Sequence, residues 1–475
     1  MWKGTIFLII FLSWFASAKA QILVSSPDTV VLDSNTARFV VGDITILGNK
    51  ITHDRIITRE LTFRKGDTLV LSSFESVFTR SEQNIFNTSL FNSVRINYLF
   101  EQDKVNLFIV VTERWYIFPV PVLEIADRNF NNWWRTKDFS RIIYGGVLTW
   151  NNFRGRNEEL AITARFGYIQ RFSFYYSVPF INKKQKAGLR FGFVFSRNHQ
   201  TTVKTAFDDL VFYNDENLFT KREIGGSVAY NYRPNLYKTY SAEAGFKKAE
   251  VVDTIISLNN DYFLPGNNTI RYFSFRYFFK NDRRDIAFYP LNGYYFDAEI
   301  VRNGIPFLGD KLDMTYTTSH YRRFFNLGHQ FYSGLEASGK YTIDKYVPYF
   351  LTRGLGYSKD FLRGYEYYVM DGKSFALLKS NFKFELLPKK ELHAKFIPLN
   401  KFSTIPFAFY LNLFADAGYV FNDQFKTNNR LINSWQYSGG AGIDFVTYYD
   451  LVFRLEYSIN KFGERGFFLH FTSSM

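Results

Sequence analysis

The chain has 475 residues, no cysteine and a formal net charge of +14 at pH 7, and 20% of its residues are aromatic. The absence of cysteine excludes disulfide bonds and thiolate metal sites. The positive charge suits contact with anionic lipid headgroups. Binding to nucleic acid fits poorly, because the chain begins with an export signal and contains no pronounced basic run.

Residues 1–20 have the pattern of a cleaved signal peptide. Lys3 supplies the positive end, residues 6–12 the apolar core, and Ala18-Lys19-Ala20 the cleavage site. A membrane anchor is the alternative, but the apolar run is too short to span a bilayer comfortably. Residues 21–36 are expected to form an N-terminal tail. No later stretch offers the roughly 18 apolar residues of a membrane helix, so an exported, aromatic-rich chain favours a transmembrane β-barrel.

Residues 37–114 predict a small α+β domain with the order strand, helix, helix, strand, strand. Thr52 is expected to cap the first helix, and the second is expected to run from Leu71 to about Phe91. The predicted strands are residues 38–47, 94–100 and 105–111.

This domain resembles a polypeptide-transport-associated (POTRA) domain. The resemblance rests on four short stretches, at residues 44–49, 65–67, 89–94 and 110–113. It implies a sheet edge to which an unfolded client adds a strand, the binding mode called β-augmentation. The alternative is a structural appendage that binds no client.

Residues 115–475 alternate apolar and polar residues in sixteen short runs. For example, Phe273, Phe275 and Tyr277 share one face, while Ser274 and Arg276 share the other. Apolar residues outside and charged residues inside suit a barrel with lipid around it and water within it. The predicted fold is therefore an all-β membrane protein, a 16-stranded antiparallel transmembrane β-barrel preceded by one POTRA domain. The runs centre near residues 121, 145, 163, 174, 191, 227, 243, 275, 296, 316, 334, 380, 411, 441, 454 and 469.

The strands of soluble β-sandwiches also alternate apolar and polar residues. The lengths of the connections help to distinguish such a fold from a membrane barrel. Connections at the end next to the N-terminal domain are mostly short, as at residues 151–156 and 233–236, and those at the other end are long, as at residues 198–218 and 251–268. That asymmetry is typical of outer-membrane barrels. The long connection at residues 343–372 carries too much aromatic surface for a disordered segment. We expect this surface loop to fold into the barrel, with Arg363 at its tip.

With this arrangement the chain resembles the BamA/TamA family of outer-membrane assembly factors. In that family the sixth surface loop enters the lumen, and its Arg-Gly-Tyr/Phe tip pairs with acidic residues of the wall. The matching tip here is Arg363, Gly364 and Tyr365, and the matching acids are Glu385 and Asp416. The alternation independently directs both carboxylates inward, and a guanidinium group suits bidentate pairing with a carboxylate.

The resemblance also implies action at the seam between the first and last strands. Pro119 and Pro121 fall in the first predicted strand, and residues two apart direct their backbone amides toward the same neighbour. That neighbour therefore loses two hydrogen bonds, and proline belongs on edge strands. We predict that the neighbour is the last strand, which contains Phe467, Leu469 and Phe471. The alternative places both prolines in a linker before the barrel.

The resemblance implies a factor that assembles or inserts unfolded β-barrel or surface proteins in the bacterial outer membrane, with its POTRA domain in the periplasm. The resemblance implies as partners these unfolded clients, periplasmic or lipoprotein accessory subunits, and outer-membrane lipid. The alternatives are a secretion pore for one partner polypeptide, and a passive channel or structural barrel plugged by the loop. An enzyme is disfavoured, because the six histidines are scattered and no HExxH, GxSxG or Walker-type stretch occurs. We predict no catalytic residue, metal or cofactor.

Overall fold

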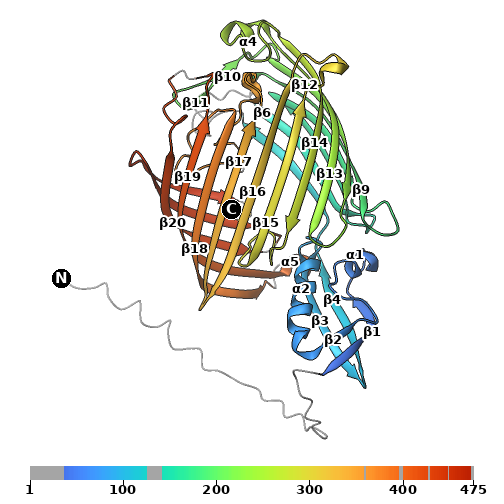
Figure 1. Cartoon of the computed structure of the whole chain (residues 1–475). Helices are drawn as coiled ribbons and strands as arrows, with labels where there is room; N and C mark the ends of the chain where they lie inside the picture. Colours follow the sequence, from blue (N-terminus) through green and yellow to red (C-terminus); the bar gives the residue numbers. More distant parts are fainter. Residues whose placement is uncertain are drawn as a thin grey trace, which may run out of the picture.

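The computed structural model describes residues 37–125, 142–357, 360–394, 400–425, 428–447 and 449–471. The predicted signal peptide (residues 1–20) and tail (residues 21–36) lie outside this part of the chain. A small N-terminal domain sits at one end of a large barrel (Figure 1). No helix within these ranges is both long and apolar enough to cross a membrane.

The N-terminal domain packs two helices on a four-stranded sheet of order β2-β1-β4-β3, in which β1 runs parallel to β4. Phe74, Phe78 and Ile85 of α2 are buried together with Leu107 and Ile109 of β4. The large apolar residues of α2 recur at helical spacing, and those of β4 recur at every second position. The two apolar faces therefore pack against each other and form this core. The elements are β1 (Arg38–Leu47), α1 (Asp54–Thr58), β2 (Thr68–Val70), a 3-10 turn (Leu71–Ser73), α2 (Phe74–Phe86), β3 (Phe91–Glu101) and β4 (Lys104–Glu113).

Two details of this domain differ from the prediction. Thr52 does not cap α1, because its hydroxyl group and backbone amide both donate to Glu113 Oε1 at 2.7 Å. The second helix ends at Phe86, well before the predicted end, because Phe91 already begins β3.

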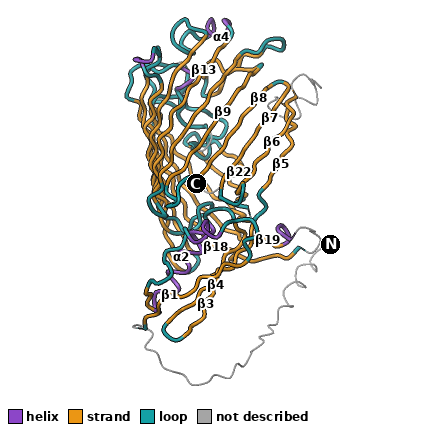
Figure 2. Tube along the Cα trace, turned by 90° about the vertical axis from the view of Figure 1, so that its right-hand side faces the viewer, coloured by secondary structure: helices purple, strands orange, loops and turns teal. Residues whose placement is uncertain are grey.

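The barrel contains the predicted sixteen antiparallel strands, and each predicted centre falls inside one of them. Figure 2 shows β5 to β9 side by side along one side of the wall. The strands are β5 (Ile117–Ile125), β6 (Ile142–Phe153), β7 (Glu158–Gly167), β8 (Ile169–Val178), β9 (Ala187–Asn198), β12 (Lys221–Tyr232), β13 (Lys238–Val251), β14 (Thr269–Asp282), β15 (Gly293–Asn303), β16 (Met314–Gly328), β17 (Phe331–Thr342), β18 (Ser374–His393), β19 (Thr404–Phe421), β20 (Gln436–Thr447), β21 (Val452–Asn460) and β22 (Arg465–Phe471).

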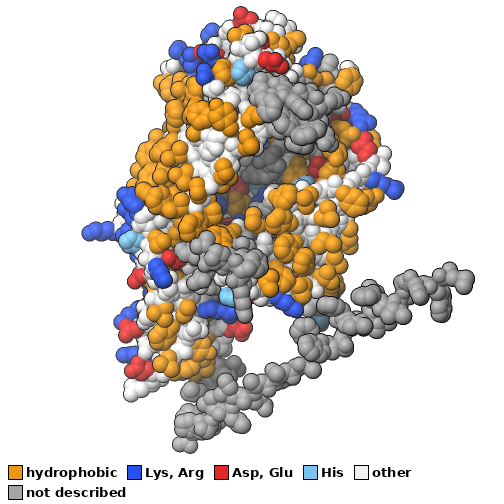
Figure 3. All heavy atoms as spheres, turned by 180° about the vertical axis from the view of Figure 1, so that it is seen from behind, with side chains coloured by type: hydrophobic (Ala, Val, Ile, Leu, Met, Phe, Trp, Pro, Cys, Tyr) orange, Lys and Arg blue, Asp and Glu red, His pale blue; other side chains and the backbone are white. Residues whose placement is uncertain are grey.

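The wall is apolar outside and polar inside, as predicted. Phe273, Phe275 and Tyr277 are 39%, 46% and 44% exposed, whereas Asp416 and Glu456 are buried. The space-filling view from behind shows hydrophobic side chains over the outer surface and on both sides of a hollow (Figure 3).

The end of the barrel away from the N-terminal domain is covered by its connections. Residues 198–218, predicted as a plain connection, instead contain the hairpin β10 (Gln200–Ala206) and β11 (Asp209–Asn214). Together with α4 (Asp253–Leu258) and the 3-10 turn Tyr349–Leu351, this hairpin builds a buried cluster that includes Phe263 and Leu312. Another 3-10 turn, Pro306–Leu308, has no buried residue. A single residue, Tyr168, joins β7 to β8, so this outer connection is short.

At the other end, the N-terminal domain is bonded to five of the turns between barrel strands. Contacts to the first three turns are His53 N–H to Gly155 O (3.0 Å), Arg59 Nε to Gln185 O (2.9 Å) and the ion pair Arg233–Glu60 (2.7 Å). Contacts to the other two are Asn87 Nδ2 to Asp285 O (2.8 Å) and the ion pair Arg114–Asp450 (2.9 Å). Burial and the neighbouring Arg233 lower the pKa of Arg59 to about 10, while Glu60 opposes the shift. Arg59 therefore stays charged at neutral pH.

Candidate functional site

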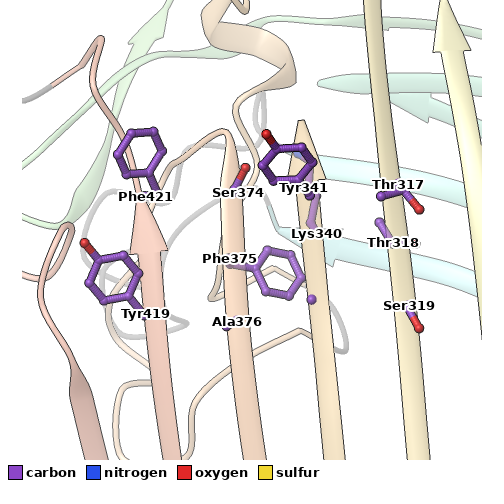
Figure 4. A pocket seen from close by; sticks show the side chains of 11 residues that line it. Thr317, Thr318, Ser319, Lys340, Tyr341, Ser374, Phe375, Ala376, Tyr419 and Phe421 are labelled. Atoms are coloured by element: carbon purple, nitrogen blue, oxygen red, sulfur yellow. The ribbon is translucent and has the colours of Figure 1, made fainter. Parts of the chain in front are cut away.

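The loop between β17 and β18 enters the barrel, as its aromatic content predicted. Figure 4 shows the strand ends where it begins and ends, with Tyr341 on β17 and Ser374 on β18. Inside, Leu355 pairs with Met370 through backbone hydrogen bonds, and Leu355 and Leu362 are almost completely buried. The tip of the hairpin β10–β11 contacts the loop from above, since Val369 N–H donates to Asp208 O at 2.9 Å. The loop is thus packed in an apolar cluster that it shares with Phe375 of β18 and Val420 of β19.

Arg363 lies at the end of this loop and is 2% exposed. Its Nε and Nη2 donate to the two carboxylate oxygens of Asp416 on β19, at 2.7 and 2.5 Å. Its Nη1 donates to Asn381 Oδ1 on β18 at 2.8 Å and lies 3.3 Å from Glu456 Oε1 on β21. The flat guanidinium group also lies 4.0 Å above the ring centre of Phe414. The predicted pair with Asp416 is therefore present, and it joins the loop to three strands.

Gly364 and Tyr365 follow Arg363 and hold the chain in place beside this pair. Gly364 has φ +82°, and a Cβ atom there would lie 3.3 Å from Ser458 Oγ, so a larger residue meets both strain and crowding. Its carbonyl accepts from Asn460 Nδ2 at 3.1 Å. Tyr365 is buried, and its hydroxyl group donates to Gln436 Oε1 at 3.2 Å. The tip is therefore held by β18 to β21 together.

Glu385, the second predicted partner, does not contact Arg363. Its carboxylate instead accepts from Tyr410 at 3.0 Å and from Tyr332 at 3.4 Å. The register of β18 explains the error, because Lys379 lies opposite Asp416 and Glu385 is six residues further along the strand. That distance is roughly 20 Å at the usual strand rise. The second acid at the tip is Glu456, whose inward direction is evident from the alternation of its strand.

Two further contacts near the tip were not predicted. Asp360 lies 3.3 Å from Nε2 of His320 on β16, whose Nδ1 is 2.8 Å from Asp297. Glu366 lies 3.4 Å from Nε2 of His470 on β22. Within the described ranges, no cluster of histidine and carboxylate side chains has an arrangement that could hold a metal ion.

The seam residues lie at the two ends of the sixteen-stranded sheet. Its order begins with β22 and ends with β5, and the described residues include no pairing between the two. Pro119 and Pro121 lie inside β5, opposite Leu148 and Gly146 of β6, so they are not in a linker. On β22, Phe467, Leu469 and Phe471 are all exposed.

The ladder between β5 and β6 shows which way the prolines face. Asn151 N–H donates to Tyr116 O at 2.8 Å, and the register then continues without a shift to Ile125. Hydrogen-bonded pairs alternate along an antiparallel ladder, so even-numbered residues of β5 bond to β6. Pro119 and Pro121 consequently occupy positions that face away from β6, on the open side of the sheet.

Comparison with known proteins places the chain in a family. Residues 152–459 match the model of the Omp85 superfamily domain, and residues 39–114 match a POTRA model described as surface antigen variable number repeat. No curated protein matches the chain.

Solved structures with a similar fold have low sequence identity. CdiB from Escherichia coli has a TM-score of 0.52 and 10% identity, with 91% of this chain and 75% of that chain covered. BamA from Haemophilus ducreyi lacking POTRA domains 1–3 has a TM-score of 0.49 and 15% identity, with 89% and 81% covered. CdiB from Acinetobacter baumannii has a TM-score of 0.46 and 12% identity, with 91% and 73% covered. Because the Omp85 superfamily model matches more than half of the chain, at residues 152–459, the chain belongs to the Omp85 superfamily.

Proposed function

We propose that this protein inserts unfolded β-barrel or surface proteins into the bacterial outer membrane, with its POTRA domain in the periplasm. The observation that carries this proposal is that β5 and β22 end the sheet and that no pairing between them occurs among the described residues. An unpaired strand edge is a template for another strand. In the membrane, where unpaired backbone groups are costly, a client strand that pairs there satisfies both chains.

The two prolines support the same proposal. Five residues of β5, at odd positions from 117 to 125, face the seam, and two of them lack an amide hydrogen. β22 therefore gains fewer hydrogen bonds from β5 than from a client strand with a full set of amides. A weak contact at this position favours exchange with a client over permanent closure.

The proposed partners are unfolded clients, outer-membrane lipid and periplasmic or lipoprotein accessory subunits. The proposal involves no catalytic turnover and no cofactor. A secretion pore for one partner polypeptide is the second candidate. It requires the loop to leave the lumen, which the burial of Arg363 among three strands opposes. A passive barrel plugged by the loop is the third candidate.

Reconstitution in lipid vesicles tests the proposal. A urea-unfolded outer-membrane barrel is added, and its folding is followed by the shift in electrophoretic mobility of unheated samples. Since the chain has no cysteine, Val120→Cys can be combined in turn with Phe467→Cys, Leu469→Cys or Phe471→Cys to close the seam by a disulfide. We expect faster client folding than in empty vesicles, inhibition by the disulfide, and recovery after reduction. Equal folding with the closed seam would refute the mechanism, and release of a soluble polypeptide without barrel folding would favour the secretion pore.

A further inference from the structure

The outer face of the barrel carries two pockets on the four neighbouring strands β16 to β19. The first pocket, of about 410 Å³, lies beside the ends of β17 and β18 between which the inserted loop runs (Figure 4). The second pocket, of about 470 Å³, lies next to it on the side toward the POTRA domain, because Leu335 and Ala337 line it on β17 where Gly339 and Tyr341 line the first. Both pockets exist because outward positions of these strands carry small residues, namely Ser319, Ala337, Gly339, Ala376, Ala415 and Ala417.

Aromatic residues mark the level of the first pocket in the membrane. Tyr341 of β17 is 63% exposed, and Tyr419 and Phe421 of β19 line the same pocket. Girdles of outward aromatic residues occur where the wall of such a barrel meets the membrane surface. Since this end of the barrel lies away from the POTRA domain (Figure 1), the first pocket opens at the outer surface of the membrane.

Both pockets end near the middle of the wall. Leu335 and Tyr341 are six residues apart on β17, which is about 20 Å at the usual strand rise and about 15 Å of depth at the usual strand tilt. That depth is half of the hydrocarbon thickness of a bilayer, about 30 Å. Nearer to the POTRA domain, the ring of Phe331 on β17 packs against those of Phe382 and Phe384 on β18, with ring centres 5.6 and 4.9 Å apart. The pockets therefore face one leaflet only, whereas a membrane helix or a second barrel contacts both.

The polar groups around the pockets are directed to the wall and the lumen rather than to the membrane. Three outward hydroxyl groups donate to carbonyl oxygens of neighbouring strands, namely Thr317 to Glu299 O at 2.8 Å, Ser319 to Asp297 O at 3.1 Å and Ser380 to Ala415 O at 2.8 Å. The charged residues of the lining alternate with the outward residues and are at most 8% exposed: Lys340, Glu336, Lys379 and Asp416. The pockets therefore offer a surface for hydrocarbon and no charged group for a lipid head group.

We propose that the two pockets bind one acyl chain of an outer-leaflet lipid, which lies along β17 and β18 with its head-group end at Tyr341 and its methyl end near Phe382. The leaflet follows from the proposed orientation, with the POTRA domain in the periplasm. Inside a membrane both the chain and the wall are already out of water, so binding comes from van der Waals contacts with the concave surface. The site goes beyond the proposed function, because two strands separate β19 from β22 and the seam contributes nothing to it.

Photochemical labelling tests the site. The full chain is reconstituted in dimyristoyl phosphatidylcholine vesicles that contain a small amount of phosphatidylcholine, or of phosphatidylglycerol, with a diazirine group in one acyl chain. After irradiation, the labelled peptides are identified by mass spectrometry. We expect stronger labelling of residues 374–382 and 415–421 than of residues 273–279 on β14, whose outward side chains are large. Because the pockets recognise the chain, both lipids should give the same pattern.

Filling the pockets should remove the bound chain. Ala376→Leu combined with Ala417→Leu places a larger side chain in each pocket, and labelling of both strands should fall to the level of β14. The matched control is Ala244→Leu combined with Ala441→Leu, which enlarges two exposed alanines on β13 and β20 that line neither pocket. Its labelling should equal that of the wild-type protein. The electrophoretic mobility of unheated samples shows whether each variant is folded.

Three outcomes would overturn the proposal. Unchanged labelling in the filled variant, or even labelling around the whole wall, would refute the site, and labelling by only one of the two lipids would refute recognition through the chain. A wild-type dimer that the filled variant no longer forms would identify a second copy as the occupant. Client folding in vesicles is measured separately, so the proposed function stands if the labelling fails.

Discussion

Arg363 combines charge pairing with a flat contact on an aromatic ring, and both depend on the shape of its guanidinium group. Lysine cannot reach Asp416, Asn381 and Glu456 at once. We therefore expect Arg363→Lys to weaken the loop nearly as much as Arg363→Ala. Removing one partner of a buried ion pair typically costs about 3–5 kcal/mol. The measurement is the rate of protease cleavage within residues 343–373 in membrane-embedded protein.

Lys65→Ala provides the comparison for this substitution. Lys65 pairs with Asp43 in the N-terminal domain, and both side chains are largely exposed. A surface pair of this kind contributes about 0–1 kcal/mol, so cleavage should remain close to that of the wild-type protein. The same cleavage rate for Arg363→Ala as for the wild type would show that the pair does not hold the loop.

The sequence predicts the direction of the lumen acids better than their partners. Alternation places Asp416 and Glu456 inward because a strand has only two faces. It does not give the height of a residue along the barrel, which depends on the register between strands. Alternation therefore could not test the match of Glu385 to Arg363, which came from the resemblance and proved wrong. The aromatic contact with Phe414 depends on the path of the loop, which periodicity does not encode.

At the scale of elements, β5 is the strand whose sequence most weakens its pairing. Pro119→Val combined with Pro121→Val restores two amides on the open side, and each new hydrogen bond contributes about 1 kcal/mol. We expect β5 and β22 to pair more firmly and client folding in vesicles to slow. The measurements are hydrogen exchange at residues 117–125 and the rate of client folding.

Replacing proline also raises the entropy of the unfolded chain, so thermal stability is not a suitable measurement here. Pro388→Val on β18 serves as the control because Pro388 is exposed and lies far from the seam in the sheet order. Faster client folding in the double variant would contradict a function that depends on a weak seam.

The sixteen membrane strands could be predicted because each is long enough for its two-residue period to be visible. β2 was missed because three residues, Thr68–Val70, show no period. The hairpin β10–β11 was missed because the buried face of β10 is mostly polar: Thr201 and Thr205 lie on either side of Val203, the only apolar residue of that face. In these segments, tertiary contacts decide the structure.

At the scale of the whole molecule, the five contacts between the POTRA domain and the barrel predict a fixed orientation. Asp450→Ala leaves Arg114, whose side chain is 6% exposed, without its two charge-assisted hydrogen bonds, at a cost of about 1.5–3 kcal/mol. Spin labels at Leu99→Cys and Leu327→Cys report the distance between the two parts. We expect a broader distance distribution in Asp450→Ala. The control is Asp43→Ala, which removes an exposed carboxylate remote from the barrel and should leave the distance distribution unchanged. An equally narrow distribution in both variants would show that Asp450 does not fix the orientation of the POTRA domain.

The POTRA domain and the barrel also enclose a cavity of about 480 Å³, between the start of β3 and the ends of β19 and β20. A space of this size takes a few side chains and is far too small for a folded domain. Arg114 and Asp450 both line this cavity, and they also form the ion pair between the POTRA domain and the barrel. The cavity therefore keeps its shape only while the domain stays docked, and its collapse would accompany any loss of that pair.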